Sequence, residues 1–284
     1  MPKVSVLLPV YNGADYLQYA IESILAQTFL DYEFIIVNDG STDTSEEIIQ
    51  HYSDARIRYL TQQNVGLTLT LNRLIREARG ELLARMDQDD WSHPERLQTQ
   101  VQFMNRNPHV KMCGTWIQAM NTKNQPMYTF HYPVTNHAIH EELLLSNPFA
   151  HGSVVIRKTD NIFYRPEYDN AEDIDNWARQ CMQHEVANIP KTLYHWRINP
   201  KGITHSRVQQ QQEAALRVLK NYRAWYLASP FVNPVTLDEI RTERKLTGRR
   251  ILWKRKIALQ KLFRQLNRKD LVQREWRYLW HMLV

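Results

Sequence analysis

The first third of the chain alternates apolar runs with segments of helical spacing, and this alternation limits the fold more than any other feature. The continuous apolar runs, each suited to a buried parallel strand, are residues 3–10, 32–37, 56–60 and 81–86. Helical spacing of apolar residues occurs between them, at residues 16–27, 42–52 and 67–78. Repeated alternation of this kind predicts an α/β fold, in which a parallel sheet carries helices on both faces.

The pattern changes after Asp90, where strand and helix signals stop alternating regularly. The helices that we expect there are residues 94–105, 137–145 and 173–184. The expected strands are residues 111–119, 127–132, 153–157 and 192–198. We therefore place the sheet-based domain at residues 1–205 and expect only helices in residues 206–284.

Polar residues follow each of the four predicted parallel strands. In open sheets of this type, ligands bind outside the carboxyl ends of the strands. The polar clusters at those ends are residues 9–13, 38–43, 63–66 and 85–90. The sequence thus predicts a binding site along one edge of the sheet.

Asp87, Asp89 and Asp90 form an acidic cluster directly after the fourth predicted strand. Residues two apart in an extended segment face the same side, so Asp87 and Asp89 can share one target while Asp90 faces elsewhere. Two carboxylates suit a hard divalent cation, Mg²⁺ or Mn²⁺, whose remaining ligands would include phosphate oxygens. The alternative is a solvated acidic turn.

No glycine-rich phosphate loop accompanies the acidic cluster. The sequence has neither a G-x-G-x-x-G segment after the first strand nor a Walker lysine motif. A diphosphate would therefore be held through the metal, which argues against a dinucleotide oxidoreductase and against a P-loop hydrolase.

An ordered set of short motifs carries a family resemblance. The motifs, which include Asn72, lie in residues 5–12, 36–43, 64–67, 78–81, 85–90, 94–97 and 171–177. Through them the sequence resembles the inverting glycosyltransferases of family 2, including those of bacterial polysaccharide and lipopolysaccharide biosynthesis. The resemblance implies the GT-A fold, with a Rossmann-like nucleotide-sugar-binding part in residues 1–115, a mixed acceptor-binding part in residues 116–205 and a C-terminal helical extension.

The resemblance also implies roles for single residues. Asp173 would take the proton from the acceptor hydroxyl as general base, with Glu172 and Asp175 as rivals. Asp89 would be the principal metal ligand, and Asp87 would face the ribose and the metal. The residues implied to hold the donor nucleoside, usually uridine, are Pro9, Tyr11, Asp39 and Asn64.

Three further residues are expected on the sugar or acceptor side. His151 lies in a segment that resembles one lining this region in the family, and a hydrogen-bonded surface histidine is the alternative. Glu172 precedes the expected base. Trp177 would cover the sugar or the acceptor, and a buried aromatic residue is the alternative.

One segment departs from the family pattern. Relatives often carry Tyr-Arg-Xaa-His, whose His can contact the metal or the diphosphate, whereas this chain has Tyr-His-Trp-Arg at residues 194–197. We hypothesise that Arg197 contacts the diphosphate directly, because a guanidinium forks well onto phosphate. His195 or His205 would then complete the metal site.

The resemblance implies a single displacement with inversion, from a UDP-sugar to an acceptor hydroxyl in bacterial surface glycan assembly. A divalent cation would stabilise the leaving diphosphate, and an Asp would act as base. The expected acceptor is a glycan or a lipid-linked glycan. Two alternatives stay open: a non-catalytic glycan-binding or scaffold protein of the same fold, and a sugar-phosphate nucleotidyltransferase.

Positive charge is concentrated at the C-terminal end. Residues 241–284 hold 14 Lys and Arg against three acidic residues, a net of +11, while the rest of the chain carries a net of −5. Basic helices with tryptophan suit an anionic membrane surface; a packed surface helix or a partner-binding face are the alternatives. We expect no nucleic-acid partner, because no such motif accompanies the charge. With no leader or membrane span in the sequence, we expect a cytoplasmic protein, peripheral on the inner membrane face.

Overall fold

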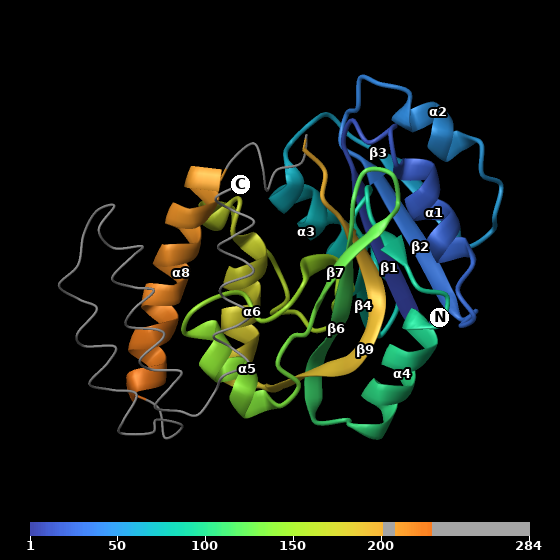
Figure 1. Ribbon diagram of the computed structural model, residues 1–284. Helices are drawn as coiled ribbons and strands as arrows, with labels where there is room; N and C mark the ends of the chain where they lie inside the picture. The colour runs from blue at the N-terminus through green and yellow to red at the C-terminus, as the bar shows by residue number, and fades with distance from the viewer. Residues whose placement is uncertain (201–207, 229–284) are drawn as a thin grey trace. The chain divides into compact units, whose positions relative to one another are not determined.

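The computed structural model describes residues 1–200 and 208–228 (Figure 1). The chain divides into two compact units, Met1–Arg223 and Ala224–Val284. The basic segment 241–284 and the predicted boundary at residue 205 lie outside the described residues, so both predictions stay predictions. Among the residues described, no helix is both long and apolar enough to cross a membrane.

Four parallel strands form the first half of the sheet. They are β1 (Val4–Val10), β2 (Tyr32–Asn38), β3 (Ile57–Thr61) and β4 (Leu82–Arg85), in the spatial order β3-β2-β1-β4. The helices between them are α1 (Leu17–Leu25), α2 (Ser45–Gln50) and α3 (Leu67–Glu77). Every residue of β1 and β2 is buried, because helices cover both faces, and this explains their unbroken apolar runs. The predicted α/β fold is confirmed in this half.

The second half of the sheet is mixed. The strand β8 (Val155–Arg157) pairs antiparallel with β4, and β6 (Val110–Met120) pairs antiparallel with β8. Next comes β9 (Glu185–Arg197), parallel to β6, and then the two-residue strand β5 (Trp91–Ser92). The strand β7 (Pro126–Phe130) forms a hairpin with β6, which completes a nine-stranded sheet. This arrangement is the expected mixed region.

The strand β9 begins seven residues before the predicted start at residue 192, and β5 was not predicted. The register of β9 against β6 jumps from Ile189 to Thr192. Pro190 and Lys191, which are exposed, form the irregularity that lies between them. Because proline cannot donate to the strand ladder, it is accommodated there, and it hides the strand from a reading of the sequence.

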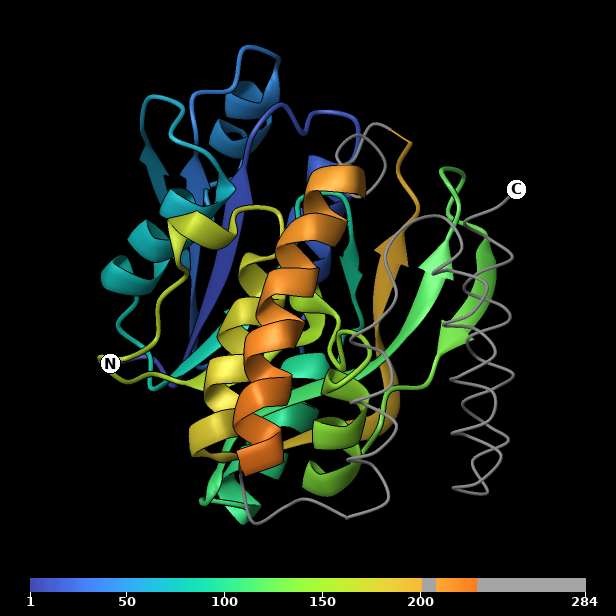
Figure 2. The same ribbon diagram turned by 90° about the vertical axis from the view of Figure 1, so that its left-hand side faces the viewer.

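Helices cover the two faces of the sheet. The remaining ones are α4 (Arg96–Arg106), α5 (Asn136–Leu143), α6 (Glu172–Gln183) and α8 (Val208–Ala228), with short 3₁₀ turns η1 (His151–Ser153) and η2 (Pro166–Tyr168). Figure 1 shows α1 and α4 on one face and α3 and α6 on the other. Figure 2 shows the helical layer of α5, α6 and α8 from its outer side. Arg223 of α8 donates to the carbonyl of Leu144, just after α5, at 2.7 Å.

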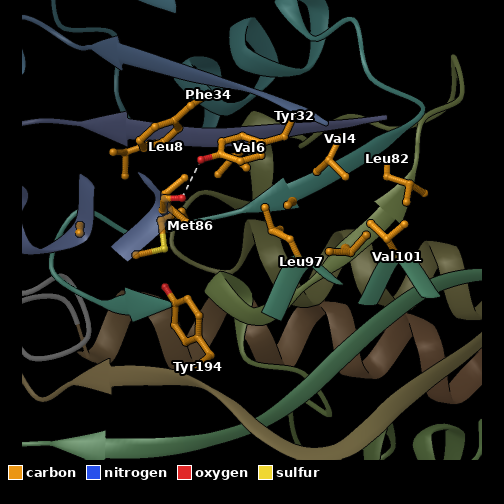
Figure 3. Close-up of a cluster of buried hydrophobic side chains, with 14 of the residues drawn as sticks. Val4, Val6, Leu8, Tyr32, Phe34, Leu82, Met86, Leu97, Val101 and Tyr194 are labelled. Atoms are coloured by element: carbon orange, nitrogen blue, oxygen red, sulfur yellow. Dashed lines mark hydrogen bonds between the residues drawn. The ribbon is translucent and has the colours of Figure 1, made fainter. Parts of the chain in front are cut away.

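One apolar core joins the two halves of the sheet (Figure 3). It contains side chains of β1 and β2 together with Leu97 and Val101 of α4 and Tyr194 of β9. The Tyr32 hydroxyl closes this core at one side by donating to the carbonyl of Ile24 at 2.8 Å. Because Tyr194 belongs both to this core and to the edge where the strands end, the core holds that edge in place.

Candidate functional site

The loop after β1 is tied to the acidic turn, residues 87–90, at the carboxyl edge of the sheet. The backbone of Tyr11 exchanges two hydrogen bonds with the Gln88 side chain, at 2.9 and 3.0 Å. At Gly13 a Cβ atom would lie 2.4 Å from Oε1 of Gln88, so a larger residue there would displace the Gln88 side chain. Tyr11 is 47% exposed, whereas Pro9 is buried within β1.

Asp39 is buried and fixes the loop between β3 and α3. Its carboxylate accepts hydrogen bonds from Nε2 of Gln62 at 2.7 Å and from the backbone of Val65 and Gly66, both at 2.9 Å. Asn64 lies exposed in this loop. The structure therefore brings Asp39 and the Asn64 loop together.

The three aspartates of the acidic turn have different surroundings. Asp87 pairs with NH2 of Arg85 at 2.7 Å and keeps 31% of its side chain exposed. Asp89 accepts from Nδ2 of Asn199 at 3.0 Å, and burial followed by the charge of Asp87 raises its pKa. Asp90 is buried and accepts from the backbone N–H of Arg197 at 2.8 Å, and burial raises its pKa well above the usual range.

Tyr194 and Gly152 pack against Asp87. The backbone N–H of Asp87 donates to the Tyr194 hydroxyl at 3.2 Å. At Gly152 a Cβ atom would lie 2.0 Å from that hydroxyl and 2.8 Å from Oδ2 of Asp87. Only glycine therefore fits between these two side chains.

Arg197 is 4% exposed and holds the acidic turn against its neighbours. Its Nε donates to the carbonyl of Asp89 at 2.7 Å, and its NH1 donates to Oδ1 of Asn124. Its guanidinium lies 4.2 Å from the ring centroid of Tyr16. The structure thus brings Arg197 to the backbone of Asp89, and its contact with a diphosphate stays a prediction.

Asp87 and Asp89 fit the oxygen chemistry of Mn²⁺ or Mg²⁺, because two carboxylates supply hard ligands and leave positions for phosphate and water. Within residues 1–200 and 208–228, no three His, Cys, Asp or Glu side chains form a group that could hold a metal ion. The ring of His195 packs against Trp91 at an interplanar angle of 38°, with centroids 4.5 Å apart. His195 as a metal ligand stays a prediction, and His205 lies outside the described residues.

Asp173 lies at the start of α6 with a donor on each carboxylate oxygen. The backbone N–H of Ile174 donates to Oδ1, and Nδ2 of Asn147 donates to Oδ2, both at 2.7 Å. Burial raises the pKa of Asp173, and these hydrogen bonds oppose that effect. Asp175, one of the expected rivals, instead pairs with Arg165 and Arg179.

Glu172 is buried next to Asp173, and the His151 side chain near it is 14% exposed. Burial, and then the charge of Asp173, raise the pKa of Glu172 to about 8. Oε1 of Glu172 lies 4.0 Å from Nδ1 of His151, whose Nε2 is 3.0 Å from the Tyr164 hydroxyl. Burial, and then the positive charge of Arg85, hold the pKa of His151 well below its usual range, so this imidazole is neutral at pH 7.

Trp177 is only 1% exposed. Its ring packs between Phe149 and His151, at centroid distances of 6.0 and 5.8 Å. Trp177 is therefore a buried aromatic residue beside His151, and its contact with the sugar or the acceptor stays a prediction.

Sequence reasoning missed four residues that shape the site, and these are Arg85, Asn147, Gly152 and Tyr194. Each belongs to a motif that was singled out for another residue. The roles of Asn147, Gly152 and Tyr194 depend on contacts with residues far along the chain, so spacing alone gave no signal for them. Arg85 contacts Asp87 only two positions away, within the acidic motif itself.

Comparison with known proteins places the chain among sugar-transferring enzymes. The family model described as Glycosyl transferase family 2 matches residues 5–163. The O-antigen biosynthesis glycosyltransferase WbnJ of Escherichia coli is 32% identical over 212 residues, which cover 72% of this chain and 82% of the relative.

Solved structures share the fold. S. aureus TarS 1–349 in complex with UDP-GlcNAc superposes with a TM-score of 0.66 at 20% identity, covering 84% of this chain and 70% of TarS. The mannosyltransferase PcManGT from Pyrobaculum calidifontis, in complex with GDP-Man and Mn²⁺, gives a TM-score of 0.56 at 16% identity, covering 89% and 83% of the two chains.

Proposed function

Because the chain belongs to glycosyl transferase family 2, we propose that it transfers a sugar from a UDP-sugar to an acceptor hydroxyl with inversion. The observation that carries this proposal is the meeting of the acidic turn and Asp173 at one edge of the sheet. The negative charge of Asp87 is among the influences that raise the pKa of Asp173, so the two carboxylates are near enough to interact electrostatically. This edge is where ligands bind in sheets of this type.

The nucleoside lies, in this proposal, along the carboxyl ends of β1 and β2. Tyr11 presents an exposed ring beside the acidic turn, and Asp39 and Asn64 follow on the neighbouring strand ends. Uridine is the base we propose, and the TarS complex with UDP-GlcNAc supports it through the shared fold.

Asp89 and Asp87 hold Mn²⁺ or Mg²⁺ at the diphosphate in this proposal. The cation neutralises the charge that the leaving nucleoside diphosphate gains. Arg85 and Asn199 keep the two carboxylates in place, since each donates a hydrogen bond to one of them. The Mn²⁺ in the PcManGT complex supports a metal on this fold.

Asp173 takes the proton of the acceptor hydroxyl in the proposed reaction. An alcohol is a poor nucleophile until a base within hydrogen-bond reach relieves it of its proton. Attack from the side opposite the diphosphate inverts the anomeric centre in a single displacement. An oxocarbenium-like transition state is expected, as in other glycosyl chemistry.

The proposed acceptor is a bacterial surface glycan or its lipid-linked precursor. The similarity to WbnJ, an O-antigen biosynthesis glycosyltransferase, supports this class. A membrane contact through residues 241–284 belongs to the same proposal. Liposome flotation of the full chain against a 1–240 truncation tests that contact, and equal flotation of the two would remove it.

Release of UDP from a panel of UDP-sugars, beginning with UDP-GlcNAc and with Mn²⁺ present, tests the reaction. Wild type is compared with Asp89→Asn, Asp173→Asn and the control Asp160→Asn, whose carboxylate is exposed. We expect slow release by wild type and the control, and at least a hundredfold less by the other two. Binding of UDP without release from any sugar would instead favour the scaffold alternative.

A further inference from the structure

Asn147 contacts the carboxylate that the proposed reaction uses as its base. It lies in the segment between α5 and η1, and its Nδ2 donates to Oδ2 of Asp173 at 2.7 Å. We infer that Asn147 is a positioning residue, whose amide orients the Asp173 carboxylate and stabilises its ionised form. The inference rests on the proposed role of Asp173 as the base.

A second hydrogen bond fixes which end of the Asn147 amide faces Asp173. Oδ1 of Asn147 accepts from the backbone N–H of Phe149 at 3.2 Å, in the manner of an Asx turn. An amide has one acceptor end and one donor end, so the N–H₂ end must point at Asp173. A donor at that position favours the charged carboxylate over the neutral acid.

The Asp173 carboxylate is held from two elements at once. Ile174 of α6 donates to Oδ1 and Asn147 donates to Oδ2. These two contacts set the plane of the carboxylate. An ionised carboxylate can accept about four hydrogen bonds, so sites remain for an acceptor hydroxyl.

The segment that carries Asn147 is anchored to the sheet. Asn188 of β9 is 1% exposed, and its Nδ2 donates to the carbonyls of Pro148 at 3.1 Å and Pro133 at 2.7 Å. A Cβ atom at Gly114 would lie 2.3 Å from Oδ1 of Asn188, so β6 leaves room for this side chain by carrying glycine. The segment that carries Asn147 is thus hydrogen-bonded to Asn188, a buried side chain of the sheet.

Charged and titratable groups surround Asp173 on several elements. Asp87 of the acidic turn opposes its ionisation, and Glu172 and Tyr164 are coupled to it electrostatically. Burial acts in the same direction as Asp87, while the donors from Asn147 and Ile174 act in the opposite one. The amide of Asn147 is therefore one of the donors that favour the ionised form of this base.

The direct test is a carboxyl ¹³C NMR titration of the full chain, with the Asp173 signal assigned by its loss in Asp173→Asn. We compare wild type with Asn147→Ala and Asn147→Ser. Serine keeps an oxygen for the Phe149 N–H but loses the amide donor. The control is Asn161→Ala, which removes an exposed amide that donates to Gln183 and accepts from Thr159. We expect the Asp173 titration to move to higher pH in both Asn147 variants and to stay unchanged in the control.

Release of UDP from UDP-GlcNAc as a function of pH gives the second readout. On the acidic side of the profile we expect both Asn147 variants to be about tenfold slower than wild type, because a hydrogen bond to a charged group is lost. On the alkaline side, where Asp173 is ionised in every variant, the difference should shrink to about twofold. A merely structural role would lower the rate equally at every pH.

An unchanged Asp173 titration in a folded Asn147 variant would overturn the inference. A shifted titration in a protein that releases no UDP from any sugar would leave the positioning role standing and sink the proposed function. If Asn147→Ala does not fold, Asn147→Ser supplies the same comparison with the local turn preserved.

Discussion

Replacement of Arg197 by alanine should destabilise the protein even when no ligand is bound. The side chain donates to the carbonyl of Asp89 and to Asn124, and its guanidinium lies over the ring of Tyr16. Two part-buried hydrogen bonds from a charged donor contribute about 1 kcal/mol each, and a cation–π contact contributes about 1 kcal/mol. The expected loss is therefore about 3 kcal/mol, which lowers the melting temperature by about 6–12 °C for a domain of this size.

Thermal denaturation without ligand measures this loss. The matched control is Arg76→Ala, which removes an exposed guanidinium from α3 and should stay within about 0.5 kcal/mol of wild type. Arg197→Lys keeps the positive charge but loses the planar guanidinium with its several donors. We therefore expect a melting temperature between those of wild type and Arg197→Ala. A melting temperature of Arg197→Ala equal to that of wild type would refute the stabilising role of the contact between Arg197 and the Asp89 carbonyl.

The same variants separate two roles of Arg197. If Arg197 contacts the diphosphate and does nothing else, the unliganded melting temperature stays constant and only the affinity for UDP falls, with uridine affinity unchanged. If Arg197 holds the acidic turn, stability falls first and Mn²⁺-dependent UDP binding falls with it. Calorimetric titration with UDP and with uridine distinguishes these results.

Two further changes probe the interior of the site. Gly152→Ala would place a Cβ atom 2.0 Å from the Tyr194 hydroxyl, so we expect about 1–3 kcal/mol of destabilisation and weaker Mn²⁺–UDP binding; unchanged UDP affinity would contradict the packing argument. Glu172→Gln should flatten the pH dependence of stability. The folded pKa of Glu172 is raised to about 8, so wild type loses stability as pH rises from about 5 towards 8, when the unfolded chain has already released its proton. Urea denaturation at pH 5 and at pH 8 measures the free energy of unfolding of both proteins. The same difference between wild type and Glu172→Gln at the two pH values would refute the prediction.

The parallel half of the fold could be predicted because its physics is local. A strand covered on both faces must be apolar at every position, and β1 and β2 are buried throughout. The helices between these strands carry apolar residues at helical spacing, because only one face of each helix packs on the sheet.

The second half was harder to predict because its strands are shaped by their partners. The exposed residues Pro190 and Lys191 interrupt β9 at a jump in register, so the run appears to start late. The strand β5 is two residues long and exists only because Trp91 and Ser92 pair with β9. Neither feature leaves a periodic pattern in the sequence.

Contacts between distant residues explain what the motifs did not predict. Tyr194 meets Asp87 across 107 positions, and Asn147 meets Asp173 across 26. The motifs identified Asp87 and Asp173 as chemical groups. Which side chains hold them depends on packing that only the folded chain reveals.

The spacing of the acidic turn now has a structural account. Asp90 is buried and accepts the backbone N–H of Arg197, so the third carboxylate helps to close the fold. Asp87 and Asp89, two residues apart, are each held by one side-chain donor, from Arg85 and Asn199. A single donor leaves a carboxylate with further acceptor sites, which a cation or a phosphate-bound water can use. Asp90 thus ties the turn to β9, while Asp87 and Asp89 retain free acceptor sites for the proposed metal ion.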